Sequence, residues 1–146
     1  ADTVLAWQTG YPFSVNLARG YPRYNPSEYS GQTLLERREV DACLFVGSHG
    51  TRRFSPAARS LLDEIPTIVL DSPTSDLPLQ PTVRITTAIY GIHAAGTAYR
   101  MDEVPLPLKA FLESDYPTDA FVLSEIERQA RAITSEARLG NSLALG

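Results

Sequence analysis

Short apolar runs alternate with helix-like patterns along the first half of this chain. Val4–Trp7, Ala42–Val46 and Thr67–Leu70 are apolar or β-branched and have the length of a strand. Ala42–Val46 is apolar at every position, which is typical of a parallel strand buried on both faces. We therefore predict that these three segments are central strands of one sheet.

Helix start signals follow the predicted strands. Ser27 is predicted to be the N-cap of a first helix. Ser55 followed by Pro56 predicts a second helix, because proline is favoured at the first helical position. Thr118-Asp119 is predicted to cap a third helix. Its apolar positions recur at intervals of three and four residues: Val122, Ile126, Ala130 and Ile133.

The other segments complete the predicted domain. Residues 72–82 are rich in proline and serine and predict a loop, 83–90 predict a strand, and 91–107 predict irregular structure with a short hairpin. The alternation of strands and helices favours an α/β domain over residues 1–134, with three layers and a mostly parallel central sheet. Residues 135–146 are small and polar, and we expect a flexible tail there.

Composition excludes several classes of protein. The 146 residues carry a formal net charge of −4, which makes non-specific binding to nucleic acid unfavourable. No apolar run approaches the roughly 20 residues that a membrane span requires. A single cysteine, Cys43, rules out an internal disulfide and a zinc site of several cysteines. These features predict a cytoplasmic protein.

One edge of the predicted sheet is a candidate binding site. Parallel sheets bind ligands at the carboxyl ends of their strands, so Gln8–Pro12, Gly47–Arg53 and Asp71–Thr74 are expected to converge. The small residues of Gly47-Ser48-His49-Gly50 are compatible either with a phosphate-binding turn or with a plain strand-to-helix turn.

The remaining reactive side chains do not form a recognisable catalytic set. His49 and His93 lack the spacing of a metal site and are interpreted as surface or hydrogen-bonded histidines. Cys43 lies within an apolar strand, where core packing is the expected role. No nucleophile elbow of the GxSxG kind occurs. We therefore predict no catalytic residue and no metal ligand in this chain.

An aromatic connection follows the first predicted strand. Five aromatic residues occur within it or directly after it: Tyr11, Phe13, Tyr21, Tyr24 and Tyr29. Tyrosine and phenylalanine on a long loop favour an interface or the wall of a ligand site. The alternative is a loop that folds back on its own core.

Four strings of residues carry a specific resemblance. They are Trp7–Phe13, Arg19–Pro26, Glu39–Ala42 and Gly96–Asp102. From Trp7 to about Leu108 the chain resembles the B subunit of formylmethanofuran dehydrogenase and of the bacterial formyltransferase/hydrolase complex. The B subunit is similar to the large molybdopterin-dependent oxidoreductases. The resemblance implies an excised or C-terminal part of a longer polypeptide, with a Rossmann-like domain.

In active relatives this domain holds half of a bis-molybdopterin guanine dinucleotide that carries tungsten or molybdenum. The metal-binding cysteine and the iron–sulfur motif lie upstream of it, so the isolated chain is expected to bind no cofactor and to catalyse nothing. The resemblance assigns cofactor binding, or the remains of it, to eight residues. They are Gln8, Thr9, Gly10, Gly47, Ser48, Asp71, Thr97 and Arg100.

Three departures from the family pattern lie near that site. His49-Gly50 replaces Asp-Pro, 72–82 lacks a threonine-rich acidic segment, and His93 and Ala95 stand where glutamates are expected. The resemblance thus favours a structural B-type subunit with a degenerate pterin-dinucleotide site, in a complex of formyl and formate metabolism. Two alternatives stay open: the pterin-binding domain of an active tungsten or molybdenum dehydrogenase, and an unrelated nucleotide-binding module.

The resemblance also implies partners, which are the other subunits of such a complex. We expect the aromatic connection Gln8–Pro26 to contact them, with Gly96–Asp102 lying near it. The predicted interface residues are Tyr11, Tyr21, Arg23 and Tyr24.

Overall fold

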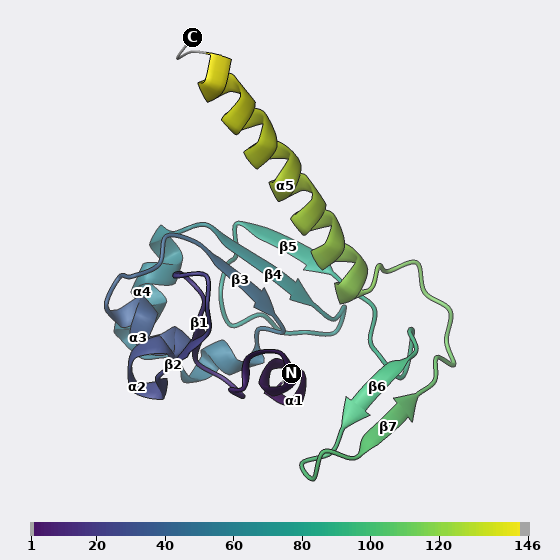
Figure 1. Ribbon diagram of the computed structural model, residues 1–146. Helices are drawn as coiled ribbons and strands as arrows, with labels where there is room; N and C mark the ends of the chain where they lie inside the picture. The colour runs from purple at the N-terminus through teal and green to yellow at the C-terminus, as the bar shows by residue number, and fades with distance from the viewer. Residues whose placement is uncertain (1, 144–146) are drawn as a thin grey trace.

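The computed structural model describes residues 2–143, with side-chain surroundings for 3–135. Figure 1 shows a mixed α/β fold with one parallel sheet and two small antiparallel pairs of strands. The elements are α1 (Asp2–Thr9), β1 (Val15–Asn16), β2 (Arg23–Tyr24), α2 (Pro26–Tyr29), α3 (Gly31–Glu36), β3 (Cys43–Val46), the 3₁₀ helix η1 (His49–Arg53), α4 (Pro56–Glu64), β4 (Thr67–Asp71), β5 (Val83–Thr86), β6 (Gly96–Tyr99), β7 (Pro105–Leu108) and α5 (Asp119–Leu143).

The parallel sheet has the strand order β3-β4-β5. Its central strand β4 is the best buried, with Val69 and Leu70 both 0% exposed. Helix α4 makes the crossover from β3 to β4, while residues 72–82 cross to β5 as a loop without regular structure. The segments 42–46 and 67–70 are therefore confirmed as strands, but only 67–70 is central, because β3 lies at the edge of the sheet. The strand predicted over 83–90 ends at Thr86.

Helices α3 and α4 pack together against one face of this sheet (Figure 1). Ser55 caps α4 as predicted, because its side chain accepts a hydrogen bond from the Ala58 N–H. Leu35, Ala58, Leu61 and Leu62 form one buried cluster, against which Cys43 and Phe45 of β3 pack.

The other face of β3 is open. Leu44 is 42% exposed and Val46 is 52% exposed, although both are apolar residues of a parallel strand. The prediction that 42–46 is buried on both faces is therefore wrong. In the described part of the chain, the helices that cover β3 lie on the side of Cys43 and Phe45 only.

The first predicted strand is also wrong, because Val4–Trp7 lies within helix α1. A short apolar run cannot be assigned to strand or helix by periodicity alone. Here Thr9 Oγ1 donates to the Leu5 carbonyl at 2.8 Å, and the Gly10 N–H donates to the Ala6 carbonyl. Trp7 is 62% exposed and its ring contacts Tyr99 edge-on, with centroids 5.3 Å apart.

The predicted cap at Ser27 is displaced by two residues. Asn25 is the N-cap of α2, since its side chain accepts from the Ser27 N–H, and Pro26 occupies the first turn. Helix α2 ends after one turn at Tyr29, and Ser30 is the N-cap of the next helix, α3. The expected hairpin exists as β6 and β7, with Gly96 opposite Leu108.

Helix α5 begins where predicted and extends further than predicted. Thr118 Oγ1 accepts from the Phe121 N–H at 3.2 Å, and the backbone then stays helical to Leu143, projecting from the body of the protein (Figure 1). Whether the tail from residue 135 is flexible stays a prediction, and 144–146 lie outside the described residues. No helix within 2–143 is long and apolar enough to span a membrane.

Candidate functional site at the carboxyl ends of the parallel strands

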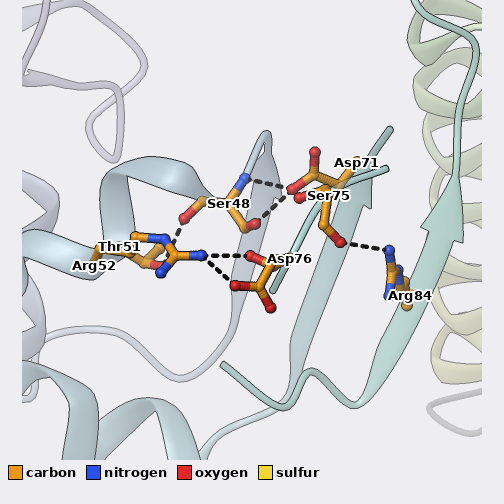
Figure 2. A network of polar contacts seen from close by, with 7 residues as sticks. All are labelled: Ser48, Thr51, Arg52, Asp71, Ser75, Asp76 and Arg84. Carbon is orange, nitrogen blue, oxygen red and sulfur yellow. Dashed lines mark hydrogen bonds and ion pairs between the residues drawn. The ribbon is translucent and has the colours of Figure 1, made fainter. Parts of the chain in front are cut away.

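The turn after β3 is tied to the end of β4 by one carboxylate (Figure 2). Asp71 Oδ2 accepts from the Ser48 N–H at 2.9 Å and from the Ser48 hydroxyl at 2.5 Å. Ser48 is 0% exposed. The predicted convergence of 47–53 with 71–74 is therefore confirmed at this pair.

Gly47 permits this turn through its backbone conformation. Its φ is +77°, a region that residues with a side chain seldom adopt. A Cβ added to Gly47 would meet no atom within 4 Å, so the glycine is not needed for a close approach by another part of the chain.

Electrostatics keep Asp71 ionised. Burial by itself would raise the pKa of Asp71, but hydrogen bonds from the Ser48 side chain and backbone, with further ones from Ser75 and Ser72, lower the pKa below its usual value. The Asp71 carboxylate therefore stays charged and accepts from both the N–H and the hydroxyl of Ser48. Both donors of the turn are used within the chain.

The residues around this pair are linked in the same way (Figure 2). Thr51 Oγ1 donates to the Ser48 carbonyl at 2.7 Å. Arg52 forms an ion pair with Asp76 at 2.8 Å, and Arg84 donates to the Ser75 carbonyl at 3.2 Å. Sequence reasoning placed no function on Asp76 or Arg84, and only this three-dimensional network reveals that both arginines anchor the 72–82 loop.

Groups that could hold a metal or act as a nucleophile do not gather here. The described residues contain no group of three or more His, Cys, Asp or Glu side chains placed for a metal ion. His93 Nδ1 accepts from the Ile89 N–H at 3.2 Å, as expected of a hydrogen-bonded histidine. Burial raises the pKa of the Cys43 thiol, which lowers its reactivity.

Two of the other predicted cofactor residues, Thr97 and Arg100, lie in a second region. Gln8, Thr9 and Gly10 end or follow helix α1 rather than a strand of the parallel sheet, so no strand end brings them beside Ser48. Helix α1 adjoins the β6–β7 hairpin: Thr3, Val4 and Ala6 line a recess of about 630 Å³ together with Pro12 and 97–101. The expectation that 96–102 lies near the aromatic connection is confirmed by this recess, and Arg100 in it is paired with Asp102 at 2.6 Å.

The aromatic connection packs largely on itself. Tyr11 stacks on Tyr24 at a centroid distance of 5.0 Å, and Phe13 meets Tyr24 edge-on at 5.7 Å. The Arg23 guanidinium lies 5.1 Å from the centre of the Tyr29 ring. Tyr21 and Tyr24 remain 53% and 39% exposed, so neither is buried in this domain's own core. An interface role for Tyr11, Tyr21, Arg23 and Tyr24 stays a prediction.

Comparison with known proteins decides the family. The chain is 42% identical over 115 residues to the B subunit of the tungsten-containing formylmethanofuran dehydrogenase 2 of Methanocaldococcus jannaschii. This chain is homologous to the formylmethanofuran dehydrogenase B subunit. A second B subunit of that kind, from Methanococcus maripaludis, is 35% identical over 113 residues. The resemblance carried by the four sequence strings is thus confirmed.

The homology covers only part of the B subunit. Each alignment includes 77% of this chain but 26% of the relative, so the chain spans about a quarter of the length of the curated relatives it matches. No family model matches the chain.

The fold has a counterpart in a solved structure. A chain in the crystal structure of the formyltransferase/hydrolase complex FhcABCD from Methylorubrum extorquens, in complex with methylofuran, matches with a TM-score of 0.70. The match covers 93% of this chain and 37% of that chain at 23% sequence identity. At that identity the likeness shows that the two chains share a fold, and it shows nothing about activity.

Proposed function

We propose that this chain serves as a structural part of a B-type subunit in a formylmethanofuran dehydrogenase-like or formyltransferase/hydrolase complex, and that its pterin-dinucleotide site is degenerate. Homology to the B subunit over 115 residues supports the assignment to such a complex. The fold shared with a chain of FhcABCD agrees with it. In this proposal the complex acts on formyl groups, and catalysis lies outside this chain.

The contact between Ser48 and Asp71 is the observation that carries the degenerate site. A dinucleotide phosphate at the end of a parallel strand needs backbone N–H groups and hydroxyls as donors. The Ser48 N–H and hydroxyl both donate to Asp71 instead. A phosphate placed there would displace these bonds and meet a carboxylate held in its charged form. The residues of this turn therefore do not fit the phosphate end of a dinucleotide.

The aromatic connection is proposed to face the partner subunits. Tyr21 at 53% exposure and Tyr24 at 39% present aromatic surface, and apolar surface costs about 25 cal/mol per Å² when left in water. The Arg23 guanidinium lies 5.1 Å from the centre of the Tyr29 ring, so this arginine belongs to the same aromatic surface.

A second candidate is the pterin-dinucleotide-binding domain of an active tungsten or molybdenum formylmethanofuran dehydrogenase. The observation in its favour is that the two matched relatives, at 42% and 35% identity, belong to tungsten-containing enzymes. In that case the recess beside Thr97 and Arg100 is the remaining candidate for cofactor contact.

Cofactor content separates the two candidates. The complex that contains this chain would be isolated through a tag on the chain and analysed for tungsten, molybdenum, guanine nucleotide and oxidised pterin, each per mole of chain. The proposal predicts none above trace. Tungsten or molybdenum near one equivalent, together with two guanine nucleotides, would overturn the structural role and establish the second candidate.

A further inference from the structure

The outer edge of β3 is not paired with another strand among the described residues. We infer that a strand from the remainder of a B-type subunit pairs with this edge and carries an element that covers Leu44 and Val46. The inference rests on the proposed function, since it takes this chain to work within such a subunit.

Backbone geometry defines the open edge. Strand β3 is the first in the order β3-β4-β5 and is paired on one side only. Cys43 N–H donates to the Pro66 carbonyl at 3.0 Å and Gly47 N–H donates to the Leu70 carbonyl at 2.8 Å. Alternate residues of a strand direct their peptide groups to opposite sides. The peptide groups of Leu44 and Val46 thus point outward, and among the described residues they bond to no other segment.

The side chains of β3 give this edge no protection. Natural edge strands are commonly blunted by lysine, proline, a bulge or a charge, which prevents pairing with other chains. Cys43-Leu44-Phe45-Val46 has none of these, and its outward-facing side chains are apolar and half exposed. The opposite edge, β5, does carry a charged and exposed residue, Arg84. The edge of β3 therefore favours an uncharged strand as its partner.

A strand paired with the edge of β3 would not by itself cover the exposed side chains of Leu44 and Val46. Parallel sheets are normally covered on both faces, yet α3 and α4 cover only the face of Cys43 and Phe45. On that face Leu44 lies beside Ile68 and Val46 beside Leu70 of β4. Leu70 is 0% exposed, so the uncovered part of the face is the one over β3, at Leu44 and Val46. A helix on that face would complete the three layers predicted from the sequence.

The remainder of a B-type subunit fits this edge better than a second copy of the chain. Two β3 strands related by a two-fold axis would join only 4 residues from each copy, and both uncovered faces would stay exposed. The aligned segment is 26% of each matched B subunit, and the fold match covers only 37% of the chain in FhcABCD. Both leave ample polypeptide for a strand and a helix.

Reconstitution tests this pairing directly. The tagged chain would be co-expressed with the part of the Methanocaldococcus jannaschii B subunit that lies outside the aligned segment. Co-purification would be measured as the molar ratio of the two polypeptides. Val46→Lys places a charge on the open edge, while Val83→Lys places one on the same sheet face at the opposite edge, at a similar exposure of 44%. Circular dichroism would verify that both variants fold.

The inference predicts a near-equimolar complex for the wild type and for Val83→Lys, with at least about a tenfold loss for Val46→Lys. It also predicts that amide exchange at Leu44 and Val46 slows in the complex. An intact complex with Val46→Lys would overturn the edge pairing, and so would equal losses for the two variants. Either result would leave the proposed membership of the larger complex untouched. Failure of the wild type to co-purify, or a dimer of the chain alone that Val46→Lys dissociates, would overturn the assigned partner.

Discussion

The two sides of β3 have the same chemistry and opposite surroundings. Cys43 and Phe45 pack against a core in which Leu61 is 2% exposed and Ala58 is 0% exposed. Leu44 and Val46, each one residue away, are half exposed to water. The apolar sequence of β3 thus predicts a strand, but it does not predict which of its side chains are buried. Burial depends on whether another element packs on that face. The open side indicates a surface that a larger assembly covers.

The largest effect is expected on the packed side. Leu61→Ala should lower the free energy of unfolding by about 2–5 kcal/mol, because the truncated side chain leaves a cavity between α4 and the sheet. Urea denaturation measures this change. Val46→Ala is the matched control on the open side and should stay within about 0.5 kcal/mol. Equal losses for the two variants would mean that the faces of β3 do not differ.

The next effect concerns the buried polar pair. Asp71→Ala should cost about 1–3 kcal/mol, because it leaves the N–H and hydroxyl of fully buried Ser48 without an acceptor. Asp76→Ala is the control, since the Asp76 side chain is 90% exposed and its ion pair with Arg52 is in water. A larger loss for Asp76→Ala would contradict this ranking.

The pH dependence follows from the same carboxylate. Since the folded-state pKa of Asp71 is lowered, its contribution is present above the unfolded pKa of about 3.9 and is lost as the pH falls further. The stability difference between wild type and Asp71→Asn should therefore shrink from pH 6 toward pH 2. Denaturation curves across that range measure the difference, and one that is constant or grows toward acid would refute the ionised state.

A smaller effect separates true helix caps from apparent ones. Ser55→Ala should cost about 1 kcal/mol, because the hydroxyl accepts from the Ala58 N–H at the start of α4. Ser27→Ala should cost less, because Asn25 rather than Ser27 caps α2. Thermal unfolding of both variants checks the order, and a reversed order would place the cap where the sequence pattern put it.

The sequence predicted those parts of the fold that local chemistry determines. The pair Ser55-Pro56 starts a helix by its own hydrogen bond and fixed φ. The segment 67–70 is rich in β-branched residues, which favour a strand over a helix, whereas Val4–Trp7 has only one. The sequence also brought Ser48 and Asp71 to one edge, because parallel strands end together. Two errors had a common origin. At Val4–Trp7 and at Leu44 and Val46, apolar residues were taken as buried, but only tertiary contacts decide burial and the choice between helix and strand.

Amide hydrogen exchange in the isolated chain most directly tests whether β3 has a paired edge towards β4 and an open outer edge. Residue-resolved exchange measured by NMR reports which N–H groups are held by stable hydrogen bonds. The account predicts slow exchange at Cys43 and Gly47, which donate to β4 and to the residue before it, and fast exchange at Leu44 and Val46 on the open edge. Equal protection at all four amides in the monomeric chain would contradict it, because the edge would then already be occupied.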